Sequence, residues 1–289
     1  KSISDSPDYA GQIAHIHTTP ARAPQWAEIP QGLSPEVRPF LHALGISRLY
    51  SHQRKAIDAM LKGLDVLLTT GTASGKSLCF QIPILEALTA DVRATALLVF
   101  PLKALARDQA ATWNAAVGRL PEAASPGTLV ARPFDGDSGA TERRKACDVG
   151  RVLVTNPEMI HSNLLPGHAR WQRFLSGLRY IVLDEVHTYT GFFGANMANV
   201  LRRLMRVCAH YGAEPQIVCC SATVGNPQGL AETLTDRPLQ VVDEDGSASG
   251  ARTYVFWNPP RIKKRLWRGR RSANVEAHEL LTALIRQKT

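Results

Sequence analysis

Two short polar segments contain residue types that could hydrolyse a nucleoside triphosphate. Gly75-Lys76-Ser77 ends the segment LLTTGTASGKS, and Asp184-Glu185 follows the apolar run RYIVL. In such a loop, glycine lets the backbone approach phosphate oxygens, lysine reaches the β- and γ-phosphates, and the serine hydroxyl suits Mg²⁺. One acid can hold the same ion while a second polarises the attacking water. We therefore predict Lys76, Asp184 and Glu185 as catalytic residues, with Ser77 and Asp184 as metal ligands.

The first segment departs from the usual phosphate loop at its start. Thr70 stands where a glycine normally opens the loop, five positions before Gly75. The side chains at Thr70 and Ala73 restrict the backbone but remove no N–H donor, so the loop can still cradle a phosphate. An ordinary strand-to-helix turn with an exposed lysine is the alternative. We expect nucleotide contacts from the loop residues Thr72, Ala73, Ser74, Gly75, Lys76 and Ser77.

The chain around these residues alternates short apolar runs with helical segments. The apolar runs, which we predict as strands, are residues 65–70, 94–100, 127–134, 151–155, 179–184 and 216–223. The predicted helices between them are 75–89, 102–117, 157–164, 194–211 and 227–235. Strands that are apolar on both faces belong to a parallel sheet covered by helices, which predicts a doubly wound α/β fold. Asn156-Pro157 and Asn226-Pro227 are typical of helix starts.

Composition divides the chain into three parts. Residues 1–48 are predicted as an N-terminal arm with a first helix, and residues 49–245 as the main α/β domain. Residues 246–289 are predicted as a basic linker, with a helix from residue 276 that begins an incomplete second domain. The stretch 261–271, RIKKRLWRGRR, supplies seven of the net +9 charges. It could follow phosphates, with Trp267 stacking on a base, or be a disordered linker.

The remaining composition is typical of a soluble globular protein, with 44% hydrophobic and 20% charged residues. No apolar run approaches the roughly 20 residues that span a bilayer, and no secretory signal is evident. The five cysteines form no C-x-x-C pair, so we expect buried, reduced thiols and no zinc. We expect a cytoplasmic protein, nucleoid-associated if bacterial. The sequence lacks an initial Met, and we expect it to be part of a longer protein.

The order of the motifs resembles that of superfamily 2 helicases. Asp184-Glu185-Val186-His187 looks like the DExH box, and Pro101–Gln109 is similar to motif Ia. Thr155-Asn156-Pro157-Glu158 resembles motif Ib, Ser221-Ala222-Thr223 resembles motif III, and Gln53 stands where the Q motif would be. Tyr50–Gln53, the loop without its opening glycine, Phe134–Ser138 and DEVHTYTGFFGANMANVLRRL are similar to one subgroup. It comprises bacterial mitomycin-repair helicases and their fungal RecQ-like relatives, which move 3′ to 5′.

The resemblance implies the ATP-binding first RecA-like domain of a DNA-repair helicase that translocates on single-stranded or tailed DNA. Tyr50 and Gln53 would bind adenine. The expected contacts to strand phosphates are Lys103, Thr155, Asn156 and Pro157. The residues expected to couple nucleotide state to DNA, with hydroxyls directed towards a histidine, are His187, Ser221 and Thr223. The turn Asp135-Gly136-Asp137 would bind DNA through backbone N–H groups or serve only as a turn.

Two alternatives differ from this expectation. One is an RNA-directed DExH ATPase, which shares the chemistry but has RNA as its partner. The other is a nucleic-acid clamp that uses ATP as a conformational switch, against which the intact Glu185 argues. Because this chain has no arginine finger from a second domain, we expect it alone to bind single-stranded DNA weakly. We also expect it to show little hydrolysis and no unwinding.

Overall fold

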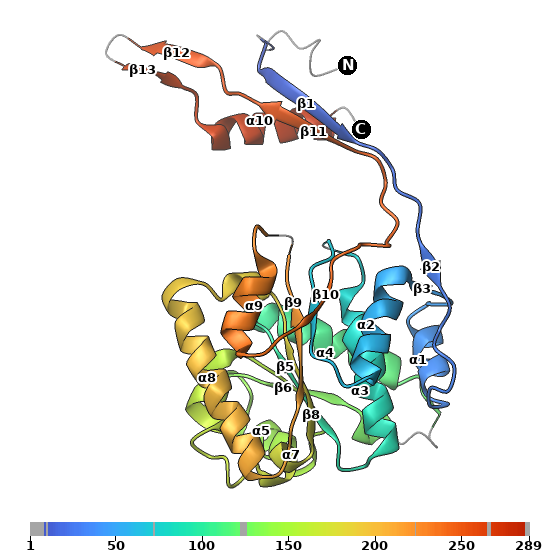
Figure 1. Ribbon diagram of the computed structural model, residues 1–289. Coiled ribbons are helices and arrows are strands. Elements are labelled where there is room, and N and C mark those ends of the chain that lie inside the picture. The colour runs from blue at the N-terminus through green and yellow to red at the C-terminus, as the bar shows by residue number, and fades with distance from the viewer. Residues whose placement is uncertain are drawn as a thin grey trace. The chain divides into compact units, whose positions relative to one another are not determined.

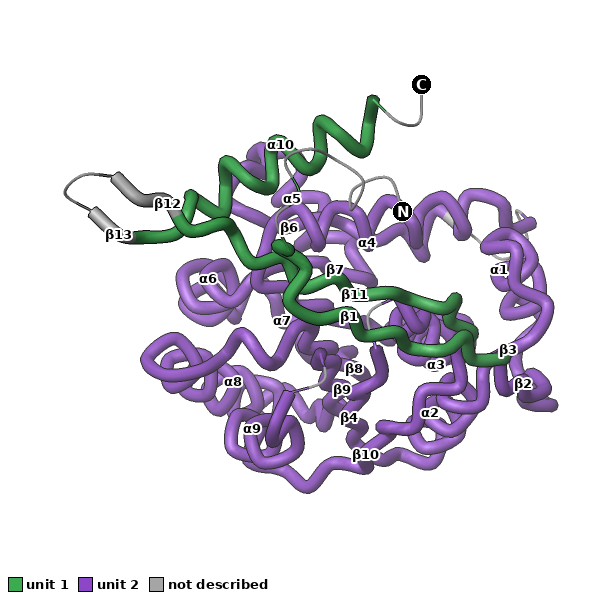
Figure 2. The backbone as a smooth tube through the Cα atoms, turned by 90° about the horizontal axis from the view of Figure 1, so that it is seen from above, with its two compact units in different colours: residues 1–23, 248–289 green, residues 24–247 purple. Residues whose placement is uncertain are grey.

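The structure is a computed structural model that describes residues 9, 11–71, 73–121, 126–222, 224–264 and 267–286. The predicted site residues Thr72 and Thr223, and the side chain of Trp267, lie outside the described part of the chain. The chain divides into two compact units, one of residues 24–247 and one of residues 1–23 with 248–289 (Figure 2). The predicted site residues that are described all belong to the larger unit.

The larger unit is built on one seven-stranded sheet (Figure 1). The strands are, in spatial order, β10 (Gln240–Val242), β4 (Val66–Leu68), β9 (Gln216–Cys220), β8 (Leu178–Leu183), β5 (Thr95–Val99), β7 (Val152–Thr155) and β6 (Ala131–Phe134). Every neighbouring pair is parallel. The predicted doubly wound α/β fold is therefore confirmed, and each of the six predicted apolar runs overlaps one strand. The seventh strand, β10, was not predicted, because it is a partly exposed edge strand that begins with the polar Gln240 and so lacks the continuous apolar run of the other strands.

Helices cover both faces of this sheet. One layer contains α1 (Val37–Ala43), α2 (Ser51–Leu61), α3 (Lys76–Ala90) and α4 (Lys103–Val117). The other contains α5 (Ala140–Val149), α6 (Pro157–Met159), the π-helix η3 (Ile160–Leu164), α7 (Gln172–Ser176), α8 (Gly191–His210) and α9 (Pro227–Thr235). Successive strand residues serve opposite layers: Leu98 packs with the first and Leu97 with the second. This alternation is why the strands are apolar along their whole length.

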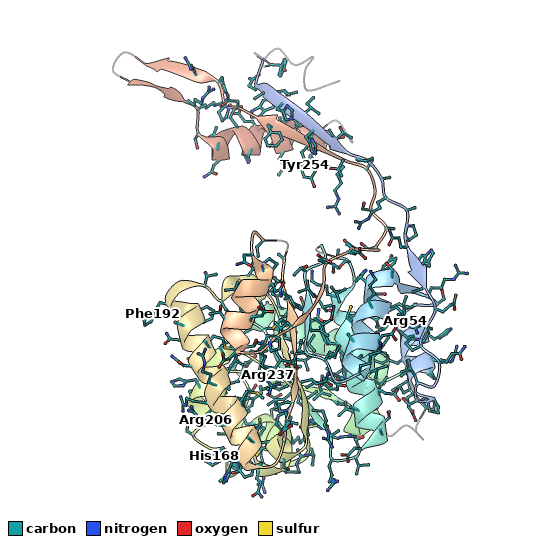
Figure 3. All side chains as sticks on the ribbon, viewed as in Figure 1. Arg54, His168, Phe192, Arg206, Arg237 and Tyr254 are labelled. Atoms are coloured by element: carbon teal, nitrogen blue, oxygen red, sulfur yellow. The ribbon has the colours of Figure 1, made fainter. Side chains whose placement is uncertain are left out.

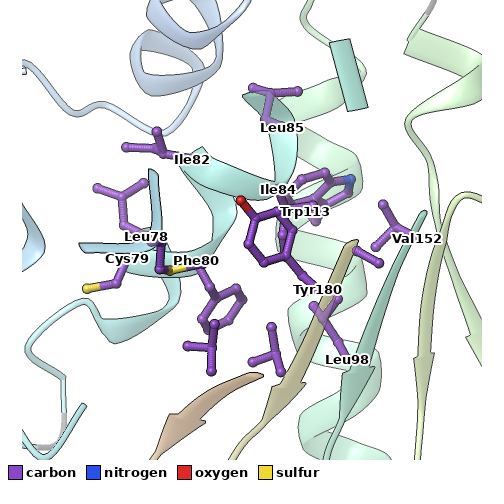
Figure 4. Packing of buried hydrophobic residues seen from close by; sticks show 14 of the residues in the cluster. Leu78, Cys79, Phe80, Ile82, Ile84, Leu85, Leu98, Trp113, Val152 and Tyr180 are labelled. Atoms are coloured by element: carbon purple, nitrogen blue, oxygen red, sulfur yellow. The ribbon is translucent and has the colours of Figure 1, made fainter. Parts of the chain in front are cut away.

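Helix α3, which follows the predicted phosphate loop, is largely buried. Phe80 and Ile84 of α3 lie in one apolar cluster with Trp113 of α4 and Tyr180 of β8 (Figure 4). The Trp113 indole N–H donates to the Leu129 carbonyl oxygen at 2.7 Å, so the ring is buried without leaving a donor unpaired. Burial of each large side chain is worth roughly 1.5–3 kcal/mol. Packing of this kind fixes the amino end of α3.

Asparagine caps start two helices, as predicted, and the first of these helices follows its strand directly. The Asn156 Oδ1 accepts a hydrogen bond from the Met159 N–H at 3.0 Å, and Pro157 is the first residue of α6. The Asn226 Oδ1 accepts from the Gly229 N–H at 3.0 Å in the same way. Short elements complete the unit: β2 (Trp26–Ala27), β3 (Leu49–Tyr50), and the 3₁₀ turns η2 (Pro126–Thr128) and η4 (Val186–Thr188).

The smaller unit differs from the expected arm and linker. β1 (Ile13–Thr19) pairs antiparallel with β11 (Arg252–Trp257), and β12 (Arg261–Lys264) pairs with β13 (Trp267–Arg270). The unit also contains α10 (Ala273–Arg286), whose Glu276 accepts from the Trp257 indole at 2.8 Å. β1 was not predicted, because its partner lies more than 230 residues away and both strands are largely exposed. The structure also groups residues 24–48 with the larger unit.

Two expectations from composition concern the cysteines and membrane-spanning helices. All five cysteine side chains are buried, as predicted. Burial raises the pKa of the Cys79 thiol to about 12, so this thiol stays protonated at neutral pH. Within the described residues, no helix combines the length and the apolar character needed to cross a membrane.

Candidate functional site

The candidate site lies along the carboxyl edge of the seven-stranded sheet. Because all seven strands are parallel, the segments that follow β4, β8, β9, β5, β7 and β6 emerge at the same edge. Open α/β sheets bind ligands at this edge. The predicted residues form two groups along it: one after β4, β9 and β8, and one after β5, β7 and β6. The spatial order of the strands places these groups on opposite halves of the sheet.

The loop between β4 and α3 has a backbone that requires glycine at residue 75. Gly75 adopts a left-handed conformation with φ +79°, and a Cβ there would lie 2.6 Å from the Gln53 Nε2. Ala73 is also left-handed, with φ 62°. Such residues turn the chain sharply and are typical of loops whose N–H groups face an anion. An ordinary strand-to-helix turn does not require both features.

Thr70, which replaces the usual opening glycine, holds the loop through its side chain. Its hydroxyl lies 2.8 Å from the Ser74 hydroxyl, and both side chains are buried. This bond spans the loop from its first residue to the residue before Gly75. The threonine therefore provides a cross-link that a glycine could not. Ala73 is exposed.

Lys76 at the start of α3 lies back over this loop. Its ammonium donates to the carbonyl oxygens of Thr70, at 2.8 Å, and Gly71, at 2.9 Å. Both acceptors are neutral, so these bonds leave the positive charge of Lys76 uncompensated. Ser77 is the next residue and is partly buried. A half-buried lysine on a glycine-containing loop at a helix amino end is suited to bind phosphate.

The side chain of Gln53 joins α2 to the loop. Its Oε1 accepts from the Tyr50 backbone N–H at 2.8 Å, and its Nε2 donates to the Gly75 carbonyl oxygen at 3.1 Å. The neighbouring His52 is fully buried, and its Nδ1 accepts from the Gly246 N–H at 3.2 Å. Its Nε2, which therefore carries the proton, lies 3.1 Å from the Ser74 carbonyl oxygen. Two side chains of α2 thus set the position of the phosphate loop.

Tyr50 belongs to a stack of three rings. Trp26 lies on Tyr50 with ring centroids 4.9 Å apart, and His52 lies 5.8 Å from Tyr50, both at an interplanar angle of 16°. Pairing of β2 with β3 places Trp26 directly opposite Tyr50. The sequence predicted Tyr50 but missed Trp26. No local pattern connects residues 24 positions apart, although an isolated tryptophan in a poorly patterned segment was a signal.

Asp184 and Glu185 follow β8, as predicted. Burial raises the pKa of Asp184 to about 6, while a hydrogen bond from the Glu185 N–H and the charge of Lys76 oppose the rise. Glu185 is left-handed, with φ 52°, which is uncommon outside glycine and asparagine. A carboxyl whose ionised form is disfavoured by burial gains from a nearby cation. Asp184 is therefore suited to hold a divalent metal ion.

His187 lies between the acidic pair and the end of β9. Its Nδ1 is 3.3 Å from the Glu185 Oε2 and also accepts from the Ala222 N–H at 3.2 Å. One nitrogen cannot donate to the carboxylate and accept from the amide at once, so a change of ring tautomer would exchange one contact for the other. The predicted partner Ser221 is buried, and its hydroxyl donates to the Ala222 carbonyl oxygen at 2.9 Å. The contact to His187 thus comes from the backbone, which the sequence could not indicate.

The other half of the edge contains an ion-pair cluster. The Lys103 ammonium donates to Asp137 at 3.0 Å. Arg107 binds both Asp137, at 3.2 Å, and Asp135, at 3.1 Å. Burial alone would raise the pKa of Asp135, but hydrogen bonds from the Asp137 N–H and Arg107 lower it below its usual value. The Asp135-Gly136-Asp137 turn therefore supplies carboxylates to the basic residues. Arg107 was not predicted as a site residue.

The predicted strand contacts after β7 are largely internal. Thr155 is buried, and its hydroxyl donates to the Phe134 carbonyl oxygen at 2.6 Å. Asn156 is the helix cap of α6, and Pro157 is buried. Helix α6 itself has only three residues before the π-helix begins. Thr155 therefore holds the ends of β7 and β6 together. Direct contacts to a ligand would come from exposed groups nearby.

Comparison with known proteins identifies the same region. A family model described as DEAD/DEAH box helicase matches residues 50–230. The chain is 38% identical over 276 residues to the uncharacterized ATP-dependent helicase YprA of Bacillus subtilis. It is 37% identical over 280 residues to the ATP-dependent helicase HRQ1 of Saccharomyces cerevisiae. In both cases the alignment covers 96% of this chain, but only 36% and 25% of the relatives.

A solved structure gives the same result. The crystal structure of the DUF1998 helicase MrfA bound to DNA and AMPPNP is 38% identical, with a TM-score of 0.88. The match covers 99% of this chain and 39% of that one. The chain thus spans between a quarter and two fifths of the length of these three proteins.

Proposed function

The chain belongs to the DEAD/DEAH box helicase family, and on this premise we propose that it is the ATP-binding motor domain of an ATP-dependent DNA helicase. One observation carries the proposal. The phosphate-loop residue Lys76 and the acidic Asp184 follow different strands of one parallel sheet. Even so, they lie near enough for the charge of Lys76 to oppose the rise in the pKa of Asp184. Nucleoside triphosphate hydrolysis needs this combination of cation and carboxylate.

We infer that the site binds ATP with Mg²⁺. Lys76 would exchange its two carbonyl partners for the β- and γ-phosphates, while the N–H groups of residues 72–77 surround them. Ser77 and Asp184 would hold Mg²⁺, which neutralises charge that develops on the phosphates. Glu185 would orient the attacking water. The fit of Mg²⁺ is supported by the partial burial of Asp184, because a carboxylate withdrawn from water favours a cationic partner.

The base would lie beside Tyr50 and Gln53. Both the oxygen and the nitrogen of the Gln53 amide already form hydrogen bonds. To bind adenine, Gln53 would therefore share or exchange one of these partners. Because one of these partners is the Gly75 carbonyl oxygen, such an exchange would link base recognition to the phosphate loop. The half-exposed Trp26 extends the ring stack next to Tyr50.

The nucleic acid would bind along the second half of the edge, at Lys103 and the Asn156–Pro157 helix start. DNA is favoured because the MrfA structure, 38% identical to this chain, is bound to DNA. His187 would transmit nucleotide state, since it lies within reach of both Glu185 and the end of β9. Ser221 and Thr223 would shape that end of β9.

We propose 49–245 as the ATP-binding RecA-like domain and 246–289 as the start of a second one that other parts of a longer protein complete. An arginine from that second domain would be needed for fast hydrolysis. The chain alone would therefore bind single-stranded DNA weakly, hydrolyse little ATP and unwind nothing. We place the protein in the cytoplasm, with the nucleoid if it is bacterial, and in DNA repair.

The test compares nucleic acids as activators. ATP hydrolysis by the protein extended through the second domain should rise with single-stranded DNA, and Glu185→Gln should stop hydrolysis while ATP and DNA binding persist. Stimulation by RNA and not by DNA would replace the DNA proposal with an RNA-directed ATPase. Unchanged hydrolysis in Glu185→Gln would contradict the catalytic assignment.

A further inference from the structure

A groove runs along one flank of α8 on the larger unit. Its first part is a hollow of about 390 Å³ between α8 and the α6–η3 segment, lined by Phe193, Met197 and Val200 among others. A second hollow of about 380 Å³ lies further along the helix and is lined by Arg206, His210 and His168. Arg203 lines both hollows, so they adjoin. Figure 3 shows Phe192 near the amino end of α8, and Arg206 and His168 towards its carboxyl end.

The charges on α8 are of one sign. Gly191–His210 contains no acidic residue, and its three arginines are Arg202, Arg203 and Arg206. Arg202 approaches Asp236 at 3.9 Å. Arg203 contacts only the His161 ring nitrogen among the described residues, at 3.1 Å, and Arg206 has no hydrogen bond or ion pair recorded with any of them. The helix dipole favours cations in the last turn, but it does not explain why two of these guanidinium groups face a hollow.

Guanidinium groups that have no carboxylate partner among the described residues suit a ligand that carries several anionic groups. Arginine binds carboxylate and phosphate through paired N–H donors. One acidic side chain, the exposed Glu158, lines the first hollow, while the second hollow is lined by basic and apolar residues. From Phe193 to His210 the helix rises about 25 Å, which is enough for several nucleotides or a short peptide.

We propose that this groove binds single-stranded nucleic acid that continues from the Asn156–Pro157 edge. Phosphates would lie on Arg203 and Arg206, and a base would rest against Phe193, whose ring is 47% exposed. Continuity favours nucleic acid over an acidic peptide, because Pro157 of the proposed strand edge also lines the first hollow. The inference rests on the proposed function, and it adds a second segment to the strand-binding path.

The experiment measures binding of labelled oligothymidylate to the 289-residue chain by fluorescence anisotropy. A strand of about 5 nucleotides covers one contact region, and one of about 16 can cover both. The double variant Arg203→Ala/Arg206→Ala should bind the long strand about tenfold more weakly and the short strand unchanged. Its slope of log affinity against log salt should become shallower by about 1.4, since two phosphate contacts are lost.

The matched control is Arg144→Ala/Arg202→Ala, which removes the same charge from positions where an aspartate already pairs with each arginine. In this control, the slope of log affinity against log salt should change by less than about half of the change expected in the double variant. Arg206→Glu, a single exposed substitution, provides a second variant if the double one does not fold by circular dichroism. An equal loss in the control and the double variant would overturn the proposal.

Two further outcomes separate this inference from the proposed function. Lys103→Ala should weaken binding of both the short and the long strand. If Lys103→Ala does so while the double variant binds both strands normally, the groove inference fails and the proposed function stands. If the unmodified chain binds neither strand at low salt, the proposed function fails as well. Loss of polyglutamate binding in the double variant, with strand binding intact, would assign the groove to acidic peptides and contradict the proposal.

Discussion

The two halves of the carboxyl edge hold their basic side chains in different ways. Lys76 donates to two neutral carbonyl oxygens of its own loop. Lys103 and Arg107 are instead paired with the carboxylates of Asp135 and Asp137. The first arrangement leaves a positive charge available to an incoming phosphate. The second is already neutral, because two cations face two carboxylates.

This difference predicts unequal affinities along the same edge. A nucleotide phosphate gains an ion pair with Lys76 and displaces only carbonyl groups. A strand phosphate must compete with carboxylates, so its net gain is smaller and more sensitive to salt. Tight nucleotide binding beside weak strand binding is what a domain needs if its grip on DNA is to depend on a second domain.

The largest effect is expected from Lys76→Ala. Loss of charged hydrogen bonds to the phosphates should weaken ATP·Mg²⁺ binding about 100-fold, or about 3 kcal/mol, as measured by calorimetry. The control Lys145→Ala removes an exposed lysine from α5 and should leave affinity unchanged. Equal ATP affinity in Lys76→Ala and the control would show that the loop is not the phosphate site.

The next effect concerns base selection by Gln53. Gln53→Ala removes the bonds to the Tyr50 N–H and the Gly75 carbonyl oxygen, and it should narrow the ratio of ATP to GTP affinity about tenfold. Gln228→Ala, on the exposed side of α9, is the control. An undiminished preference for ATP would remove Gln53 from the base site.

Acid should weaken metal-dependent nucleotide binding through Asp184. Its pKa of about 6 lies above the ordinary value of 3.8, so the ionised form that binds Mg²⁺ is lost as pH falls through 6. Affinity for ATP·Mg²⁺ should be about tenfold lower at pH 5 than at pH 7. Folding stability changes in the opposite direction: it should decrease as pH rises from about 4 to 6, because the carboxyl ionises freely in the unfolded chain while the partly buried Asp184 of the folded chain stays protonated. Asp184→Asn should flatten both profiles, and profiles that match those of the unmodified chain would exclude Asp184.

The smallest effect is expected from removing a carboxylate beside Lys103 and Arg107, and it should strengthen DNA binding. Asp137→Asn frees Lys103 and Arg107 and should tighten single-stranded DNA binding up to about fivefold at low salt. Asp148→Asn changes the same charge at a pair on α5 and corrects for the general effect. If Asp137→Asn tightens binding no more than Asp148→Asn, the carboxylates do not compete with phosphate.

The sequence predicted the elements whose environment is uniform. Strands buried on both faces, helices with asparagine caps and the polar residues at the strand ends all follow from local patterns. β8 with Asp184 and Glu185 is an example. Its apolar run shows that the strand is buried, and the two acids that follow it mark the end of the strand at the sheet edge. The main fold and most of the candidate site could therefore be predicted.

Contacts between distant segments could not be predicted. The pairing of β1 with β11 depends on exposed strands at opposite ends of the sequence, and the stacking of Trp26 on Tyr50 depends on the two-residue strands β2 and β3. The Ala222 N–H contacts His187 through the backbone, which leaves no mark on residue type. The pairing of Lys103 with Asp137 likewise joins two motifs whose interaction is visible only in three dimensions.

Amide hydrogen exchange with each ligand alone tests most directly whether one sheet edge holds both sites. ATP·Mg²⁺ should slow exchange in residues 73–77 and 184–187, and single-stranded DNA should slow it in residues 101–107, 135–138 and 155–158. ATP·Mg²⁺ should protect its segments more strongly than DNA protects its own, because ATP binding displaces no carboxylate from a basic residue. Protection by both ligands in the same segments, or DNA protection confined to the smaller unit, would contradict the division of the edge into two sites.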